Sequence, residues 1–143
     1  MFRLSRAAEY AIRGMLHLSS KPDLEATGIE EVSKAQDVPS AYLAKLFQLL
    51  AKKGYVRSFR GAGGGFALAK SPKDITLLEI IETLEGRIFL NDCLIREGYC
   101  PKDNVCPVHD VWREAQKKFL EHLNNCTFEQ LAANAIKKQK LRG

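Results

Sequence analysis

The sequence predicts a mainly α-helical fold with one small β-hairpin, and three observations indicate it. Apolar residues recur at helical spacing in several short segments that Pro or Gly residues separate. Two short stretches rich in aromatic and aliphatic residues flank a run of glycines, which is typical of a hairpin. The chain has 143 residues, 45% of them apolar, and this is enough for one compact domain with its own core.

The N-terminal part of the chain predicts three helices. Ser5 can cap the first, whose apolar residues recur at helical spacing. Thr27 and Glu30 form a capping-box pattern at the start of a second, short helix. Ser40 is expected to cap a third helix, which Gly54 ends in a left-handed conformation. This third helix would bury one stripe formed by Leu43, Leu46, Phe47 and Leu50.

Two short helices joined by a tight turn, the second with a polar and cationic outer face, are typical of a helix-turn-helix. The predicted strands at 55–60 and 66–69 would follow it as a wing, because the five residues between them include four glycines that let backbone amides approach a duplex. No Lys-Ser or Lys-Thr directly follows these glycines, so they do not match a phosphate-binding loop. We therefore predict a winged helix-turn-helix in residues 1–86.

The excess positive charge lies in the same region. Residues 1–73 carry 12 basic and 6 acidic side chains, whereas residues 74–143 carry 10 and 11. Seven cations and no carboxylate lie between Val38 and Lys73, which is the pattern expected of a surface that meets phosphate. A solvated basic face is the alternative that charge alone leaves open.

We expect the recognition helix and the wing to share contact with double-stranded DNA. Arg60, at the lip of the wing, can enter a narrow minor groove, where the potential is most negative. Lys52 and Arg57 are expected to hold the sugar-phosphate backbone. The expected DNA-binding residues are Ser40, Tyr42, Lys45, Gln48, Lys52, Arg57, Arg60, Gly63 and Gly64.

The second half of the chain predicts three further helices. Thr76 and Glu79 form a capping box, and the helix that they start ends at Gly86. Pro107 can open a longer helix with an apolar side that one small domain cannot cover, so we expect it to pair with its copy in a twofold homodimer. A last short helix starts at Thr127, and residues 137–142 form a basic end that is expected to be loose.

Three cysteines, Cys93, Cys100 and Cys106, fall within one turn-rich segment. In a reducing compartment clustered thiols more often bind metal than form disulfides, and this spacing lacks the tight pairs of structural zinc sites. Iron-sulfur clusters accept wider spacings. His109 is the nearest fourth donor, and Glu9 of a partner subunit is the alternative. Redox-active or buried cysteines are the other interpretations, and Cys126 is expected to be a small buried residue.

Several classes of protein are excluded by what the sequence lacks. No apolar run is long enough to span a membrane, and the first residues do not form the hydrophobic stretch of a signal peptide, so a cytoplasmic location is expected. There is no pair of carboxylates, Cys-His nucleophile arrangement or metalloprotease spacing. We therefore expect neither an enzyme nor a small-molecule substrate.

The chain resembles the iron-sulfur cluster regulators of bacteria, a winged-helix family with IscR-type and NsrR-type members. The similarity lies in residues 3–12 (RLSRAAEYAI), 42–47 (YLAKLF) and 60–66 (RGAGGGF) and in the cysteine segment. Residues 106–113 (CPVHDVWR) and 124–127 (NNCT) are more similar to the IscR type. The first gap between cysteines is one residue longer than the common five in the family.

The resemblance implies a [2Fe-2S] cluster held by Cys93, Cys100, Cys106 and His109. Glu9 matches the position of an acidic ligand from the partner subunit in NsrR-type members, which leaves a [4Fe-4S] cluster as the alternative. The implied function is that of a dimeric transcriptional regulator whose binding to a pseudo-palindromic operator is controlled by the cluster. The alternatives are a nitric-oxide-sensing repressor of the NsrR type and a zinc-held or metal-free regulator that acts through a partner protein. Residues 87–143 would then form the iron-sulfur loop and the dimerisation helix.

Overall fold

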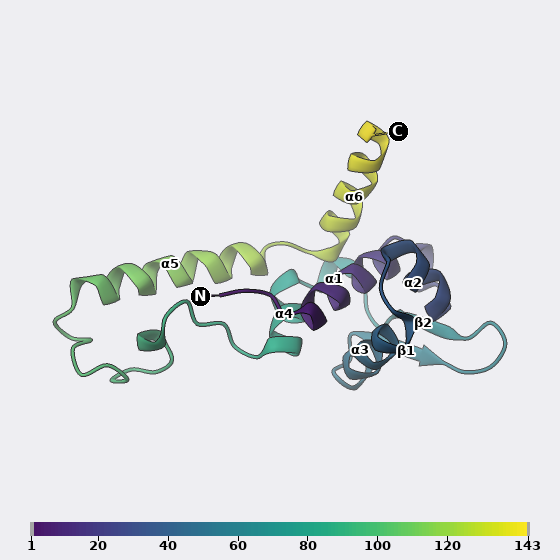
Figure 1. Ribbon diagram of the computed structural model, residues 1–143. Coiled ribbons are helices and arrows are strands. Elements are labelled where there is room, and N and C mark those ends of the chain that lie inside the picture. Colours follow the sequence, from purple (N-terminus) through teal and green to yellow (C-terminus); the bar gives the residue numbers. More distant parts are fainter. Residues whose placement is uncertain (1, 143) are drawn as a thin grey trace.

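The computed structural model describes residues 2–142 and confirms a mainly helical fold with one hairpin (Figure 1). The elements are α1 (Arg6–Ser19), α2 (Ile29–Gln36), α3 (Ser40–Lys52), β1 (Val56–Phe59), β2 (Gly65–Leu68), α4 (Leu77–Glu85), α5 (Pro107–Asn124) and α6 (Phe128–Arg142). Helices α1 to α4 and the hairpin form the body, α5 extends away from it, and α6 packs against α1.

Helices α2 and α3 form the predicted helix-turn-helix. Asp37 ends α2 in a left-handed conformation with a φ of 54°, and the buried Val38 follows it in the turn. Gly54, with a φ of 86°, directs the chain from α3 into the hairpin as expected. Two predicted caps were wrong. Pro39 is the N-cap of α3, with Ser40 as its first residue, and Gly28 rather than Thr27 precedes α2.

Thr27 has a different role, because its backbone pairs with the wing. Its N–H donates to the Phe66 carbonyl and its carbonyl accepts from the Phe66 N–H, each at 2.8 Å. A Cβ at Gly65 would lie 2.1 Å from the Thr27 carbonyl oxygen, so only glycine allows this approach. Strand β2 therefore pairs with the segment before α2 as well as with β1.

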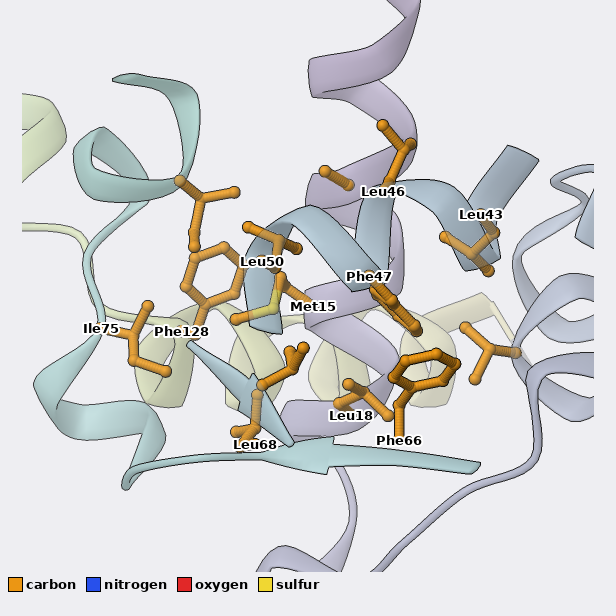
Figure 2. Packing of buried hydrophobic residues seen from close by; sticks show 14 of the residues in the cluster. Met15, Leu18, Leu43, Leu46, Phe47, Leu50, Phe66, Leu68, Ile75 and Phe128 are labelled. Carbon is orange, nitrogen blue, oxygen red and sulfur yellow. The ribbon is translucent and has the colours of Figure 1, made fainter. Parts of the chain in front are cut away.

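The core lies where α1, α3, the hairpin and α6 meet (Figure 2). Phe47 of α3 contributes the centre of the predicted stripe and is fully buried. The Phe47 and Phe66 rings lie 5.0 Å apart between centroids. A Cβ at Gly14 would lie 2.7 Å from the Phe47 ring, so this glycine lets α1 approach α3 closely. The most buried large side chains also include Met15, Leu18, Leu43, Leu50, Leu68, Ile75, Ile80 and Phe128.

The C-terminal half starts as predicted, with the Thr76 and Glu79 capping box at α4 and Pro107 as the first residue of α5. Helix α6 is longer than expected. It runs to Arg142, so the basic end that was expected to be loose is helical. Phe128 at its start is fully buried, which joins α6 to the core of the winged helix. None of the helices in residues 2–142 is both long and apolar enough to cross a bilayer.

Candidate functional site

The predicted DNA-binding residues lie on the exposed side of α3 and on the wing. The side chains of Tyr42, Lys45, Gln48 and Lys52 alternate along α3 with the buried stripe, so the helix exposes its polar face. Ser40 is half-buried at the start of the helix. Within residues 2–142, none of the seven cations between Val38 and Lys73 makes an ion pair. Their charge is therefore free to meet an anionic partner.

An aromatic contact extends this face to α1. Tyr42, with 41% of its surface exposed, packs edge-to-face on Tyr10 of α1, with ring centroids 5.7 Å apart. The guanidinium carbon of Arg13 lies 5.9 Å from the centre of the Tyr10 ring. Arg13 is exposed and was missed by the sequence analysis, which had no signal linking the first helix to the recognition helix.

The wing places its arginines at the exposed edge of the hairpin. Arg57 lies on β1, with its guanidinium 5.9 Å from the centre of the Phe59 ring, and Arg60 follows the strand. Gly63 is exposed and has a φ of 77°. Gly64 has a reason of its own to be glycine, because a Cβ there would lie 2.6 Å from the Phe59 carbonyl oxygen. The geometry of the turn thus requires glycine at 64, whatever the loop contacts.

The cysteine segment connects α4 to the far end of α5. It contains a 3₁₀ turn at Asp92–Leu94, and the Leu90 N–H donates to the Gln116 side chain of α5 at 2.8 Å. All four cysteines of the chain are free thiols and half-buried, so the prediction that Cys126 is buried holds only in part. The Cys126 thiol donates to the His122 carbonyl at 3.3 Å, at the end of α5.

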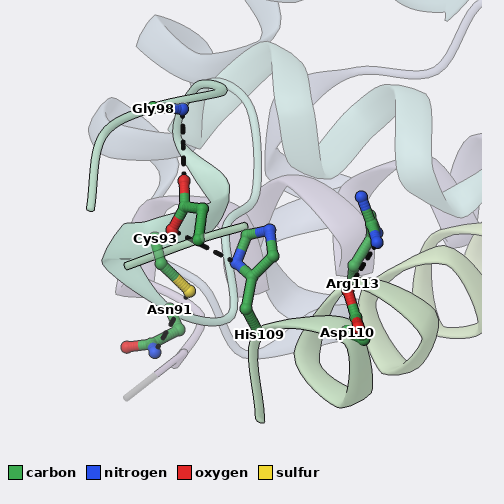
Figure 3. Close-up of polar contacts among 7 residues, drawn as sticks. Asn91, Cys93, Gly98, His109, Asp110 and Arg113 are labelled. Carbon is green, nitrogen blue, oxygen red and sulfur yellow. Dashed lines mark hydrogen bonds and ion pairs between the residues drawn. The ribbon is translucent and has the colours of Figure 1, made fainter. Parts of the chain in front are cut away.

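Cys93 and His109 line the same cavity, which has a volume of about 450 Å³ and lies between the cysteine segment and the first turns of α5 (Figure 3). Asn91 donates to the Cys93 sulfur at 3.6 Å. Asp103 lies in the wall of this cavity opposite His109, a position that the sequence analysis missed.

The Asp103 and His109 side chains are only 9% and 12% exposed. Asp103 Oδ1 lies 3.6 Å from His109 Nδ1, and neither atom has a hydrogen-bond partner among the described residues. The other carboxylate oxygen, Oδ2, accepts the Gly98 N–H at 3.1 Å. Buried polar atoms are normally hydrogen-bonded, so Asp103 Oδ1 and His109 Nδ1, which face each other, each have an unused hydrogen-bonding position.

The structure does not bring all the predicted metal ligands together. Cys100 and Cys106 do not line the cavity, and no three Cys, His, Asp or Glu side chains within residues 2–142 are close enough to hold a metal ion. Glu9 is exposed in the first turn of α1. The donor types nevertheless fit an iron-sulfur group, because three free thiols lie in one loop and one of them, Cys93, shares a cavity with the His109 imidazole.

Comparison with known proteins decides the family. Residues 4–134 match the Rrf2 model, described as an iron-dependent transcriptional regulator. The chain belongs to the Rrf2 family. The HTH-type transcriptional regulator IscR of Pectobacterium carotovorum is 32% identical over 92% of this chain and 80% of its own length. The regulator of the same name from Yersinia pseudotuberculosis is 31% identical over the same shares.

Solved structures agree with this Rrf2 assignment. T. potens IscR is 26% identical, with a TM-score of 0.75 over 96% of this chain and 91% of its own. CymR, the global cysteine regulator of B. subtilis, is 28% identical, with a TM-score of 0.70 over 94% and 98%. This Rrf2 protein is accordingly a winged-helix transcriptional regulator and not an enzyme.

Proposed function

We propose that this Rrf2 protein is a homodimeric regulator whose binding to double-stranded DNA is controlled by an iron-sulfur cluster, of the [2Fe-2S] type. The observation that carries the proposal is the cavity at the start of α5, which a thiol, Cys93, and an imidazole, His109, line together. The similarity to transcriptional regulators named IscR supports it. Cys93, Cys100, Cys106 and His109 would hold the cluster.

The two parts of the chain would have different roles. Residues 1–86 would read DNA, and residues 87–143 would bind the cluster and form the dimer. Helix α5 contains no buried residue, and Val108, Val111 and Trp112 are 53%, 66% and 40% exposed. An apolar side of this length on an extended helix supports pairing with a second copy of the chain.

In the dimer, the two α3 helices would enter successive major grooves about 34 Å apart, which requires a pseudo-palindromic operator. The exposed residues of α3 would contact bases and phosphates. Arg57 and Lys52 would hold the backbone, and Arg60 would enter the minor groove. The cations have no competing ion pairs among the described residues, and this supports their use on phosphate.

The cluster would control DNA binding by fixing the conformation of the cysteine segment. When bound, the cluster would supply bonds from thiolate and imidazole to iron, and such metal sites contribute on the order of 10 kcal/mol to ordering a segment. The Cys93, Cys100 and Cys106 thiolates would then hold the loop against His109 in the first turn of α5. If only about 1 to 3 kcal/mol of this free energy favours one arrangement of the dimer over another, operator affinity changes five- to 150-fold.

Anaerobic purification followed by absorption spectroscopy tests the cofactor. We expect sulfur-to-iron charge-transfer bands that are absent in Cys100→Ala and unchanged in Cys126→Ala, the matched control just after the C-terminal end of α5. A colourless protein that contains zinc would favour the zinc-held alternative. If removal of metal leaves DNA affinity unchanged, the proposed control is wrong.

The fourth ligand separates the IscR-type interpretation from the NsrR-type alternative. Glu9 is exposed in the first turn of α1, so a partner subunit could use it. With His109 as ligand, His109→Ala changes the cluster spectrum and Glu9→Gln does not. The opposite result would identify Glu9 of the partner subunit as the ligand and favour the [4Fe-4S], nitric-oxide-sensing alternative.

A further inference from the structure

The least explained charged group of the cysteine segment is the Asp103 carboxylate. Its side chain is only 9% exposed, and its Oδ1 lies 3.6 Å from Nδ1 of His109. Gly98 fixes one oxygen through its backbone N–H at 3.1 Å, so the other oxygen, Oδ1, faces Nδ1 of His109. Burying a carboxylate is costly unless its oxygens are used, and one of these two is unused among the described residues.

A carboxylate in this position determines which nitrogen of the imidazole carries the proton. A neutral imidazole has one N–H donor and one lone pair. The carboxylate opposite Nδ1 can only accept, so it favours the form with the proton on Nδ1 and leaves the lone pair on Nε2. Closing the 3.6 Å separation to a hydrogen bond of about 2.8 Å requires a movement of less than one ångström.

We propose that Asp103 is the positioning residue for His109. Its carboxylate accepts the Nδ1 proton, fixes the ring, and presents Nε2 as a donor to iron. A metal-binding histidine generally donates its second ring N–H to such a partner. This inference rests on the proposed function, since it assigns a role toward the cluster, but its first consequence is a property of the metal-free protein.

Asp110 provides a matched control. It lies next to His109 in sequence, yet its side chain is 66% exposed and pairs with Arg113 at 2.6 Å (Figure 3). Asp110→Ala therefore removes a carboxylate next to His109 in sequence and leaves the Asp103 carboxylate, which faces Nδ1, in place. If negative charge near the histidine were sufficient, both aspartates would have the same effect.

Nitrogen NMR on the ¹⁵N-labelled, metal-free full chain, at a pH where imidazole is neutral, measures the tautomer directly. The His109 signals are assigned by their absence in His109→Cys, and unchanged His17 signals show that the winged helix is folded. We expect the Nδ1–H form in the wild type and in Asp110→Ala. In Asp103→Ala we expect the Nε2–H form, which free histidine prefers. An Nε2–H form in the wild type, or an unchanged tautomer in Asp103→Ala, overturns the proposal.

A double-mutant cycle separates positioning of His109 from general support of the loop. Asp103→Ala should weaken cluster retention against a chelator about 10- to 100-fold, the usual cost of removing such a partner. In the His109→Cys background it should have no further effect, because thiolate ligation needs no tautomer. An equal loss in both backgrounds means that Asp103 acts only through Gly98, which overturns the proposal. If the wild type binds no cluster, the proposed function fails while the tautomer result still stands.

Discussion

Replacing Arg60 with Gln should lower the salt dependence of DNA binding by a calculable amount. Each phosphate that a protein neutralises contributes about −0.9 to the slope of log K against log salt concentration. If Lys45, Lys52 and Arg57 on the backbone and Arg60 in the minor groove each neutralise one phosphate charge, the proposed dimer neutralises about eight, and the slope is about −7. Affinity would then fall about 20,000-fold between about 50 and 200 mM salt.

Arg60→Gln removes one contact per protomer, so the slope should become less negative by about 1.8. Fluorescence anisotropy with a labelled duplex measures it, and the duplex need not contain the operator because the phosphate term is independent of sequence. Arg142→Gln, at the end of α6, changes net charge equally and should leave the slope unchanged. Equal slopes for both variants would refute the argument that Arg60 of the wing neutralises phosphate charge.

Three further predictions concern the stability of the fold. Gly65→Ala, with its Cβ 2.1 Å from a backbone oxygen, should lower the free energy of unfolding by about 2 kcal/mol or more. Gly28→Ala should cost about 0.5 to 1 kcal/mol, because nothing lies within 4 Å of its Cβ and only the N-cap preference of α2 is lost; urea unfolding measures both. Phe128→Ala should cost about 3 to 5 kcal/mol in the same assay, because this fully buried ring joins α6 to the core. Burial and the nearby Glu79 raise the pKa of Tyr55. The stabilisation from its neutral form is present below pH 10 and is lost as the pH rises through the folded-state pKa. Tyr55→Phe should therefore lose less stability than the wild type between about pH 9 and 11, which urea unfolding across this range would show.

Most of the fold was predictable because its signals are local. The stripe on α3 and the Thr76 capping box depend on residues within one helix, and both are present as predicted. Thr27 was misassigned because its local pattern fits a cap, whereas its backbone is used by Phe66, far along the chain. The packing of Phe128 in the core, which joins α6 to the winged helix, is not shown by any local pattern.

The candidate site divides in the same way. Lys45 and Arg57 lie on a regular helix and strand, so periodicity is sufficient to place them on the exposed face. Asp103 was missed because a carboxylate in a turn-rich segment looks like a solvated charge. Only the folded loop, through the Gly98 N–H, turns it toward His109. Arg13 was missed because the contact between Tyr10 and Tyr42 connects helices that are distant in sequence.

The connections of α5 provide a physical route by which the cysteine segment, far from the wing, would affect DNA binding in the proposed function. The C-terminal end of α5 is attached to the start of α4, where the Thr76 hydroxyl donates to Asn124 at 3.1 Å and the Leu77 N–H donates to the Cys126 carbonyl at 2.8 Å. Its N-terminal end follows the cysteine segment, which leads from the other end of α4 (Figure 1). The two helices and this segment thus form a closed circuit, in which α4 is fixed to the core by the buried Ile80. Apart from the 3₁₀ turn, the segment is the part of this circuit without regular structure. In the proposed dimer, ordering this segment would set the angle of α5, and hence the distance between the two recognition helices.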